Sequence, residues 1–214
     1  MEDWDYLGNL INRVAFLRQP GLTLELLREA IAVGFRAASE TTVHHPSSMA
    51  GYLAWGETIK FLRDELIPCE WTCVDVDNVP GVLSPDGHIR IIAASGTAPT
   101  GSLDAAPRFV KPKGSATAGM IRNNATEIQT VLPGIPPLPE EPGDDVTTWV
   151  LVYHHNFNKD ESRGELSFPI RLDGGTSVRW ACRGILETVR HNEPSDKGGD
   201  QGPTDVIDID ITQR

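Results

Sequence analysis

The sequence predicts one α+β domain, in which helices, most of them in an N-terminal helical layer, cover only one face of a largely antiparallel β-sheet. In the first third of the 214-residue chain, apolar residues recur at spacings of three and four, as they do on amphipathic helices. After Pro68 they alternate with polar residues or form short β-branched runs, which are typical of strands. Because the strand-like segments cluster together, a doubly wound β-α-β architecture is disfavoured. We therefore expect a single domain over 1–214, with a helical part at 1–68 and a sheet-forming part at 69–214.

Three helices are expected in the helical part. The first follows an apolar stripe that begins at Trp4 and ends before Pro20. Thr23 is placed to cap the second, because a threonine oxygen accepts a hydrogen bond from a free backbone N–H group of the first turn. Ser47 or Ser48 opens the third, whose expected core positions are Tyr52, Trp55, Ile59, Leu62 and Leu66.

The sheet-forming part begins with an expected hairpin. The Ser-Pro-Asp-Gly sequence at 84–87 has Pro and Gly where turns favour them, and it should join two strands. A short helix is expected from about Ala116 to Val131. Near the end of the chain aspartate alternates with Val and Ile. This pattern is typical of an edge strand whose negative charge opposes aggregation. The segments expected to form strands are residues 70–76, 88–95, 148–156, 164–172, 177–189 and 205–211.

Charge and cysteine content narrow the class of protein. The chain has 30 acidic and 19 basic side chains, so its net charge of −11 disfavours direct, non-specific binding to nucleic acid. Its three cysteines form neither an even disulfide set nor a CxxC pair. The acidic N-terminus lacks the features of a signal peptide, and no apolar run reaches the ~20 residues of a membrane helix. We expect a cytoplasmic, soluble protein with reduced thiols and no contact with membranes.

A basic loop, residues 96–117, leads into the short helix expected near residue 116. Between residues 104 and 122 four basic side chains are opposed by Asp104 alone. The loop leads to a helix start, where free backbone N–H groups favour an anion. The order Lys113-Gly114 is not that of a nucleotide-binding P-loop. The alternative is a flexible, solvated loop whose lysines offset the net acidity. The candidate ligand-binding residues are Lys111, Lys113, Gly114, Ser115 and Thr117.

Two adjacent histidine pairs, at 44–45 and 154–155, suggest a second kind of site. Neighbouring side chains of a strand point to opposite faces, so only one histidine of the second pair can join a given site. If that hairpin pairs symmetrically about Asp160, His155 faces Glu165 across the strands. The alternative is that the histidines only pack or lie at the surface, because no HExxH motif occurs. The candidate catalytic residues are His155 and Glu165, and the candidate metal ligands are His44, His155 and Asp160.

Two functions from different classes follow from these features. The first is a non-catalytic binding or accessory module, in which the basic loop and the proline-rich loop at 132–147 face a small anionic ligand or a protein partner. The alternative is a metal-dependent hydrolase or phosphoesterase, in which the His/carboxylate cluster holds a divalent metal and the lysines hold substrate phosphate. The sequence leaves the cofactor undetermined, with a divalent metal implied only by the alternative, and it does not determine the oligomeric state.

Overall fold

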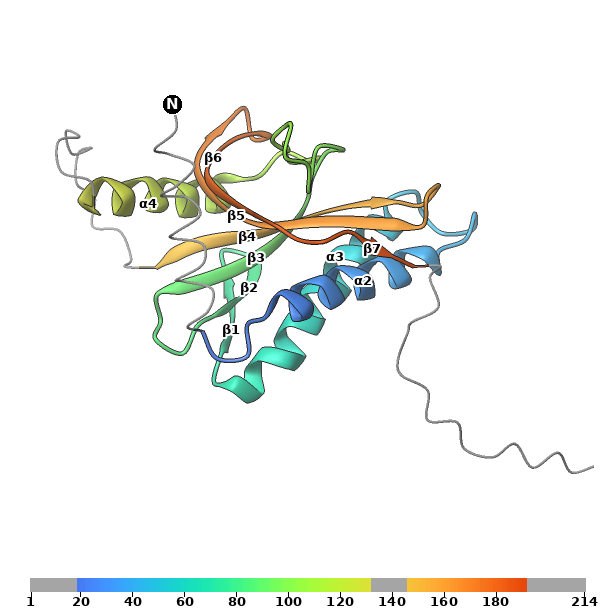
Figure 1. Ribbon diagram of the computed structural model, residues 1–214, viewed down its shortest axis with the longest axis horizontal. Helices are drawn as coiled ribbons and strands as arrows, with labels where there is room; N and C mark the ends of the chain where they lie inside the picture. The colour runs from blue at the N-terminus through green and yellow to red at the C-terminus, as the bar shows by residue number, and fades with distance from the viewer. Residues whose placement is uncertain (1–18, 132–145, 192–214) are drawn as a thin grey trace, which may run out of the picture.

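The computed structural model describes residues 19–131 and 146–191. Within them, three α-helices and a seven-stranded sheet form the α+β architecture that the sequence predicts (Figure 1). The helix expected over residues 4–18, the strand expected over 205–211 and nearly all of the proline-rich loop lie outside the described residues. None of the helices in the described part combines the length and apolar character that crossing a bilayer requires.

Two of the helices form the layer predicted before Pro68. Helix α2 spans Leu24–Ser39, and the Thr23 hydroxyl accepts a hydrogen bond from the backbone N–H of Leu26, as expected of an N-cap. Helix α3 spans Met49–Leu66 and continues into a short 3₁₀ turn at Ile67–Cys69. Of the core positions expected on α3, the last three are buried and Trp55 is half-buried.

Tyr52 departs from this expectation, since 60% of its surface is exposed. It lies in the first turn of α3, where its ring meets the basic loop instead of the sheet: the Nζ atom of Lys111 is 5.5 Å from the ring centroid. A cation over an aromatic face is attracted by the negative face of the ring, which accounts for this placement.

The strands of the sheet lie in the spatial order β1-β2-β3-β4-β5-β6. The short β7 pairs with the start of β5, ahead of the part of β5 that pairs with β6. Every pair is antiparallel except β3 with β4, which run parallel because helix α4 (Ser115–Val131) carries the chain back across the sheet. The strands are β1 (Thr72–Val76), β2 (Val79–Leu83), β3 (Ile89–Ser95), β4 (Thr147–Asn156), β5 (Glu161–Asp173), β6 (Ser177–Ile185) and β7 (Val189–Arg190).

The expected direct pairing of 70–76 with 88–95 is wrong, because β2 lies between these two segments. Asp77 and Asn78 form a two-residue turn between β1 and β2, both with positive φ, a conformation that Asn and Asp tolerate in hairpins. The turn predicted at 84–87 is present, with the Gly87 N–H donating to the Ser84 carbonyl, and it joins β2 to β3.

The two faces of the sheet have separate cores. Helices α2 and α3 pack on one face, and α4 packs on the other, so the expectation of helices on one face only is wrong (Figure 1). This arrangement buries β3 and β4 on both faces, which explains why their apolar runs do not alternate with polar residues. Strand residues in the α2–α3 core include Ile91, Ala93, Leu151 and Leu166, and those in the α4 core include Ile92, Ala94, Val150 and Val152.

Candidate functional site

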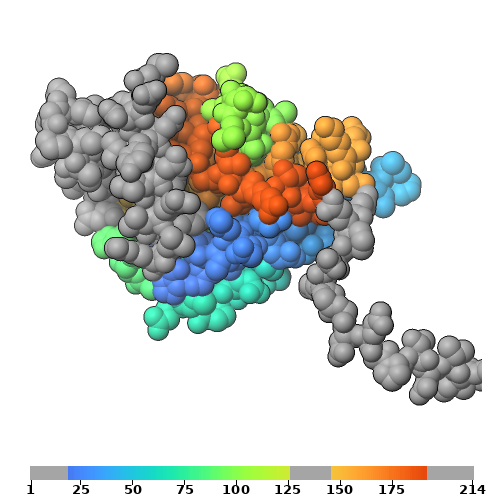
Figure 2. All heavy atoms as spheres, in the orientation of Figure 1, coloured from blue at the N-terminus to red at the C-terminus, as the bar shows by residue number. Residues whose placement is uncertain are grey.

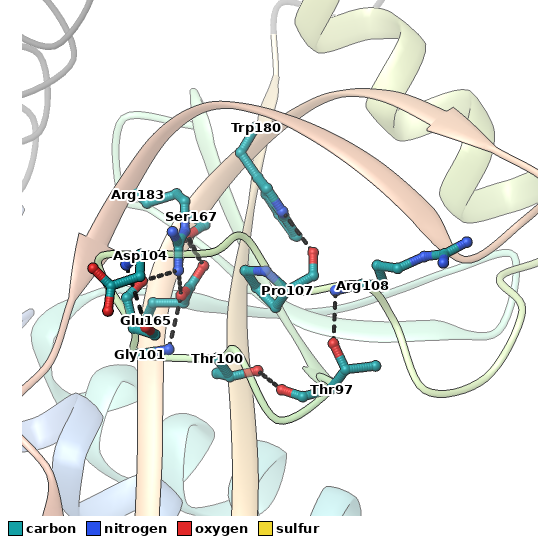
Figure 3. A network of polar contacts seen from close by, with 11 residues as sticks. Thr97, Thr100, Gly101, Asp104, Pro107, Arg108, Glu165, Ser167, Trp180 and Arg183 are labelled. Carbon is teal, nitrogen blue, oxygen red and sulfur yellow. Dashed lines mark hydrogen bonds and ion pairs between the residues drawn. The ribbon is translucent and has the colours of Figure 1, made fainter.

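The basic loop between β3 and α4 is fastened to the sheet. Its ends are held by an isolated bridge between Gly96 and Phe109, and by the N–H of Val110, which donates to the Ser95 carbonyl at 3.0 Å. From β6, the Trp180 indole donates to the carbonyl of Pro107 at 3.0 Å (Figure 3). Figure 2 shows the loop, in green, against the orange surface of β5 and β6. The loop therefore presents its side chains from a fixed backbone.

Glu165 of β5 is the anchor of this loop. Its carboxylate is fully buried and accepts hydrogen bonds from the Gly101 N–H at 3.0 Å and from the Ser167 hydroxyl at 2.8 Å. The guanidinium of Arg183 on β6 donates to both carboxylate oxygens and also to the carbonyl of Ser102 (Figure 3). Glu165, predicted to be catalytic, thus has the contacts of a structural ion pair.

The register of the β4–β5 hairpin differs from the predicted one. Asn156 pairs with Glu161 and His155 with Ser162, so the turn is centred between Asn158 and Lys159 rather than on Asp160. Asp160 has a left-handed φ of 47° and ends the loop, so the ladder starts at the next residue. His155 consequently does not face Glu165.

Glu165 and His155 project to opposite faces of the sheet. Glu165 pairs with Val152, which belongs to the α4 core, whereas the ring of His155 contacts Phe35 of α2. His44 is exposed in the connection between α2 and α3. In the part of the chain that the structure describes, no three His, Cys, Asp or Glu side chains lie close enough to hold one metal ion.

Two predicted ligand-binding residues line one cavity, which we call the lysine cavity. It measures about 170 Å³, and Lys113 and Thr117 are among its lining residues. Its apolar walls include Trp55, Ile92 and Phe109. The Nζ atom of Lys113 lies 4.9 Å from the centroid of the Phe109 ring.

The Lys113 side chain is half-buried, so its ammonium is partly withdrawn from water. Burial lowers its pKa, and the nearby charge of Lys111 lowers the pKa further. Across residues 19–125 and 146–191, no aspartate or glutamate lies within ion-pair distance of Lys113. The cavity therefore contains a cation that these residues leave without a counter-charge.

The turn between β5 and β6 fixes the backbone of Lys113. The Lys113 N–H donates to the Gly175 carbonyl at 2.9 Å. Gly175 has a φ of +74°, and a Cβ atom there would lie 3.1 Å from the Cβ of Pro112, so a glycine allows this close approach. The other predicted ligand-binding residues lie outside the cavity lining: Lys111 sits over Tyr52, and Gly114 and Ser115 are exposed at the start of α4.

A second cavity, of about 190 Å³, contains His155 and is called the histidine cavity below. Sequence reasoning missed the two residues that orient this imidazole. The Nδ1 atom of His155 is 2.8 Å from the Ser162 hydroxyl, which in turn is 2.9 Å from Nε2 of His191. Only the correct strand register could have revealed Ser162 as the partner, and His191 follows β7, which the sequence did not predict as a separate strand.

Comparison with family models, with curated proteins and with solved structures finds no match for this chain.

Proposed function

We propose that the protein is a binding module that takes a small organic anion into the lysine cavity. The observation that carries the proposal is the half-buried Lys113 ammonium on the wall of this cavity, which has no carboxylate partner among the described residues. An ammonium removed from water without a counter-charge is costly, and an anion bound beside it offsets that cost.

The lining of the cavity indicates the chemistry of the anion. Thr117, which is 5% exposed, supplies a hydroxyl from the first turn of α4, and the free N–H groups of that turn favour negative charge. The rings of Trp55 and Phe109 form apolar walls that suit a small hydrocarbon body. The ligand class is therefore a carboxylate or phosphate ester attached to one ring or a short chain.

A titration with three matched probes tests this proposal. Benzoate and phenyl phosphate carry the charge, whereas benzamide has a similar ring without it. Heteronuclear NMR should show saturable binding of at least one anion and weaker binding of benzamide. Lys113→Gln should weaken anion binding about ten-fold or more, since a hydrogen bond to a charged group contributes about 1.5–3 kcal/mol.

Lys111→Gln is the control, because this lysine belongs to the same loop and has the same charge but lies outside the cavity lining. It should change the affinity by less than about three-fold, as expected of an exposed charge. Equal losses in the two variants would indicate general attraction to the basic loop, and equal binding of benzamide and benzoate would contradict the proposal.

The hypothesis of a metal-dependent hydrolase has less support. The sheet register directs His155 and Glu165 to opposite faces, so these two residues do not share one site. Glu165 is also engaged by Arg183, Ser167 and Gly101.

A further inference from the structure

The histidine cavity opens to the surface between three segments of the chain. Gly96 and Val110 border it from the basic loop, and Phe157 borders it from the turn after β4. Gly51 borders it from the first turn of α3, and a Cβ atom at this glycine would have no neighbour within 4 Å. The cavity therefore has an open mouth, where a further side chain meets no obstruction.

Large apolar side chains are exposed around this mouth. Val110 is 54% exposed and Phe157 is 48% exposed, although both line the cavity. Tyr52, which follows Gly51 on α3, is 60% exposed. Single exposed apolar side chains are common, but a group of them around a cavity is typical of a surface that binds another molecule. We call Tyr52, Val110 and Phe157 the apolar rim.

The interior of the cavity suits an uncharged aromatic group. Tyr153 and His155 line it from β4, and Ala54 lines it from α3. The imidazole of His155 offers the cavity no hydrogen-bonding atom, because Nδ1 faces the Ser162 hydroxyl and Nε2 is buried. A dry cavity of about 150 Å³ holds benzene, so one of about 190 Å³ has room for the ring of a phenylalanine side chain.

Two exposed lysines belong to the segments that carry the apolar rim. Lys111 follows Val110, and its Nζ atom lies 5.5 Å from the centroid of the Tyr52 ring. Lys159 is exposed two residues after Phe157. Among the described side chains, neither lysine lies within ion-pair distance of an aspartate or glutamate. In a chain with a net charge of −11, such a basic border favours an acidic molecule.

We propose that the histidine cavity and its apolar rim form a docking surface for an acidic segment of a partner protein, which inserts a phenylalanine side chain into the cavity. A molecule small enough to enter the cavity leaves the rim in water, whereas a peptide covers the rim with the residues on either side of its anchor. Acidic residues at those positions lie beside the lysines. The surface is separate from the lysine cavity, because the two linings have no residue in common.

Titration of the full chain with three peptides tests the proposal in the wild-type protein. The probe is acetyl-Glu-Asp-Phe-Asp-Glu-amide. One control peptide has Ser in place of Phe, and the other has Gln and Asn in place of the four acids. NMR should show saturable binding of the probe, with shifts of the Gly51 and Val110 amide signals. The Ser peptide should bind about ten-fold or more weakly, and the neutral peptide about three-fold or more weakly.

Two glycine variants locate the binding site. Gly51→Leu places a side chain at the mouth of the cavity and should weaken binding of the probe about ten-fold or more. Gly56→Leu is the matched control, because Gly56 lies on the same helix and faces equally open space but is not part of the cavity lining. It should bind the probe as the wild-type protein does, and so should Lys113→Gln.

The proposal is overturned if the probe does not bind, if either control peptide binds as tightly as the probe, or if the two glycine variants lose affinity equally. It is also overturned if the amide signals of Gly51 and Val110 depend on protein concentration before any peptide is added. In that case the molecule that covers the apolar rim is a second copy of this chain.

Discussion

At the scale of single residues, His155 shows how burial decides the charge of a group. Burial lowers its pKa from 6.5 to about 4, and the charges of His191 and His154 act in the same direction. The pKa of His191 is lowered too, chiefly by burial and by Arg36, although Asp160 opposes this. Both imidazoles are therefore neutral near pH 7.

The lowered pKa of His155 predicts how stability depends on pH. The unfolded chain binds this proton below about pH 6.5, whereas the folded protein binds it only near pH 4. The free energy of unfolding should therefore fall as the pH drops from about 6.5 towards 4. His155→Phe should flatten this dependence, and the exposed His44→Gln should leave it unchanged. Urea unfolding of the wild-type protein and of both variants at pH 7 and pH 4.5 measures this dependence. If the free energy of unfolding falls equally in all three proteins, His155 is not the group responsible.

The sequence singled out some residues of the candidate sites and missed others for a physical reason. Lys113 and Thr117 could be found because a basic segment before a helix start is a local pattern. Ser162 could not, because its meeting with His155 depends on the length of the hairpin loop, which the sequence does not determine. Arg183 was missed for a similar reason, since it reaches Glu165 from the next strand.

At the scale of elements, local periodicity predicted the helices better than the strands. Helices α2 and α4 begin within one residue of their expected starts, since capping and spacing are encoded locally. Strand β2 was missed because its Pro80 and Gly81 are typical of loops. Pro80 is tolerated there because it pairs only with β1, and the ladder to β3 starts at Gly81.

The contact between α2 and α3 predicts opposite effects for two helical glycines. A Cβ atom at Gly34 would lie 2.7 Å from the carbonyl oxygen of Ala54, whereas one at Gly56 would meet nothing within 4 Å. Gly34→Ala should therefore destabilise the protein by about 1–3 kcal/mol, the usual cost of overpacking. Gly56→Ala should stabilise it by up to about 1 kcal/mol through helix propensity. Thermal and urea unfolding test the pair, and a stable Gly34→Ala variant would show that the helices can separate at little cost.

At the scale of the whole molecule, distant segments meet at a few buried polar groups. Asn124 of α4 is fully buried and bonds to the backbone of Thr148 in β4 and to the Pro169 carbonyl in β5. These bonds place α4 on the face opposite α2 and α3. The sequence predicted the helix but not this face, because the side to which a crossover returns is not a local property.

The ion pair between Glu165 and Arg183 joins β5, β6 and the basic loop, so it predicts a large effect on the whole fold. Glu165→Ala leaves a largely buried guanidinium without its counter-charge, which should lower the free energy of unfolding by about 3–5 kcal/mol. Glu187→Ala removes an exposed carboxylate from its ion pair with Arg28 and should cost less than about 1 kcal/mol.

Urea unfolding of these two variants and of a Glu165→Met/Arg183→Met double variant separates charge from packing. The double variant should recover part of the loss, because apolar side chains of similar length leave no unpaired charge. In the Glu165→Ala protein the amide of Gly101 should also exchange its hydrogen faster, since the carboxylate that accepts it is gone. If Glu165→Ala is as stable as Glu187→Ala, the basic loop is held by its backbone bonds alone, and the lysine cavity does not depend on the ion pair.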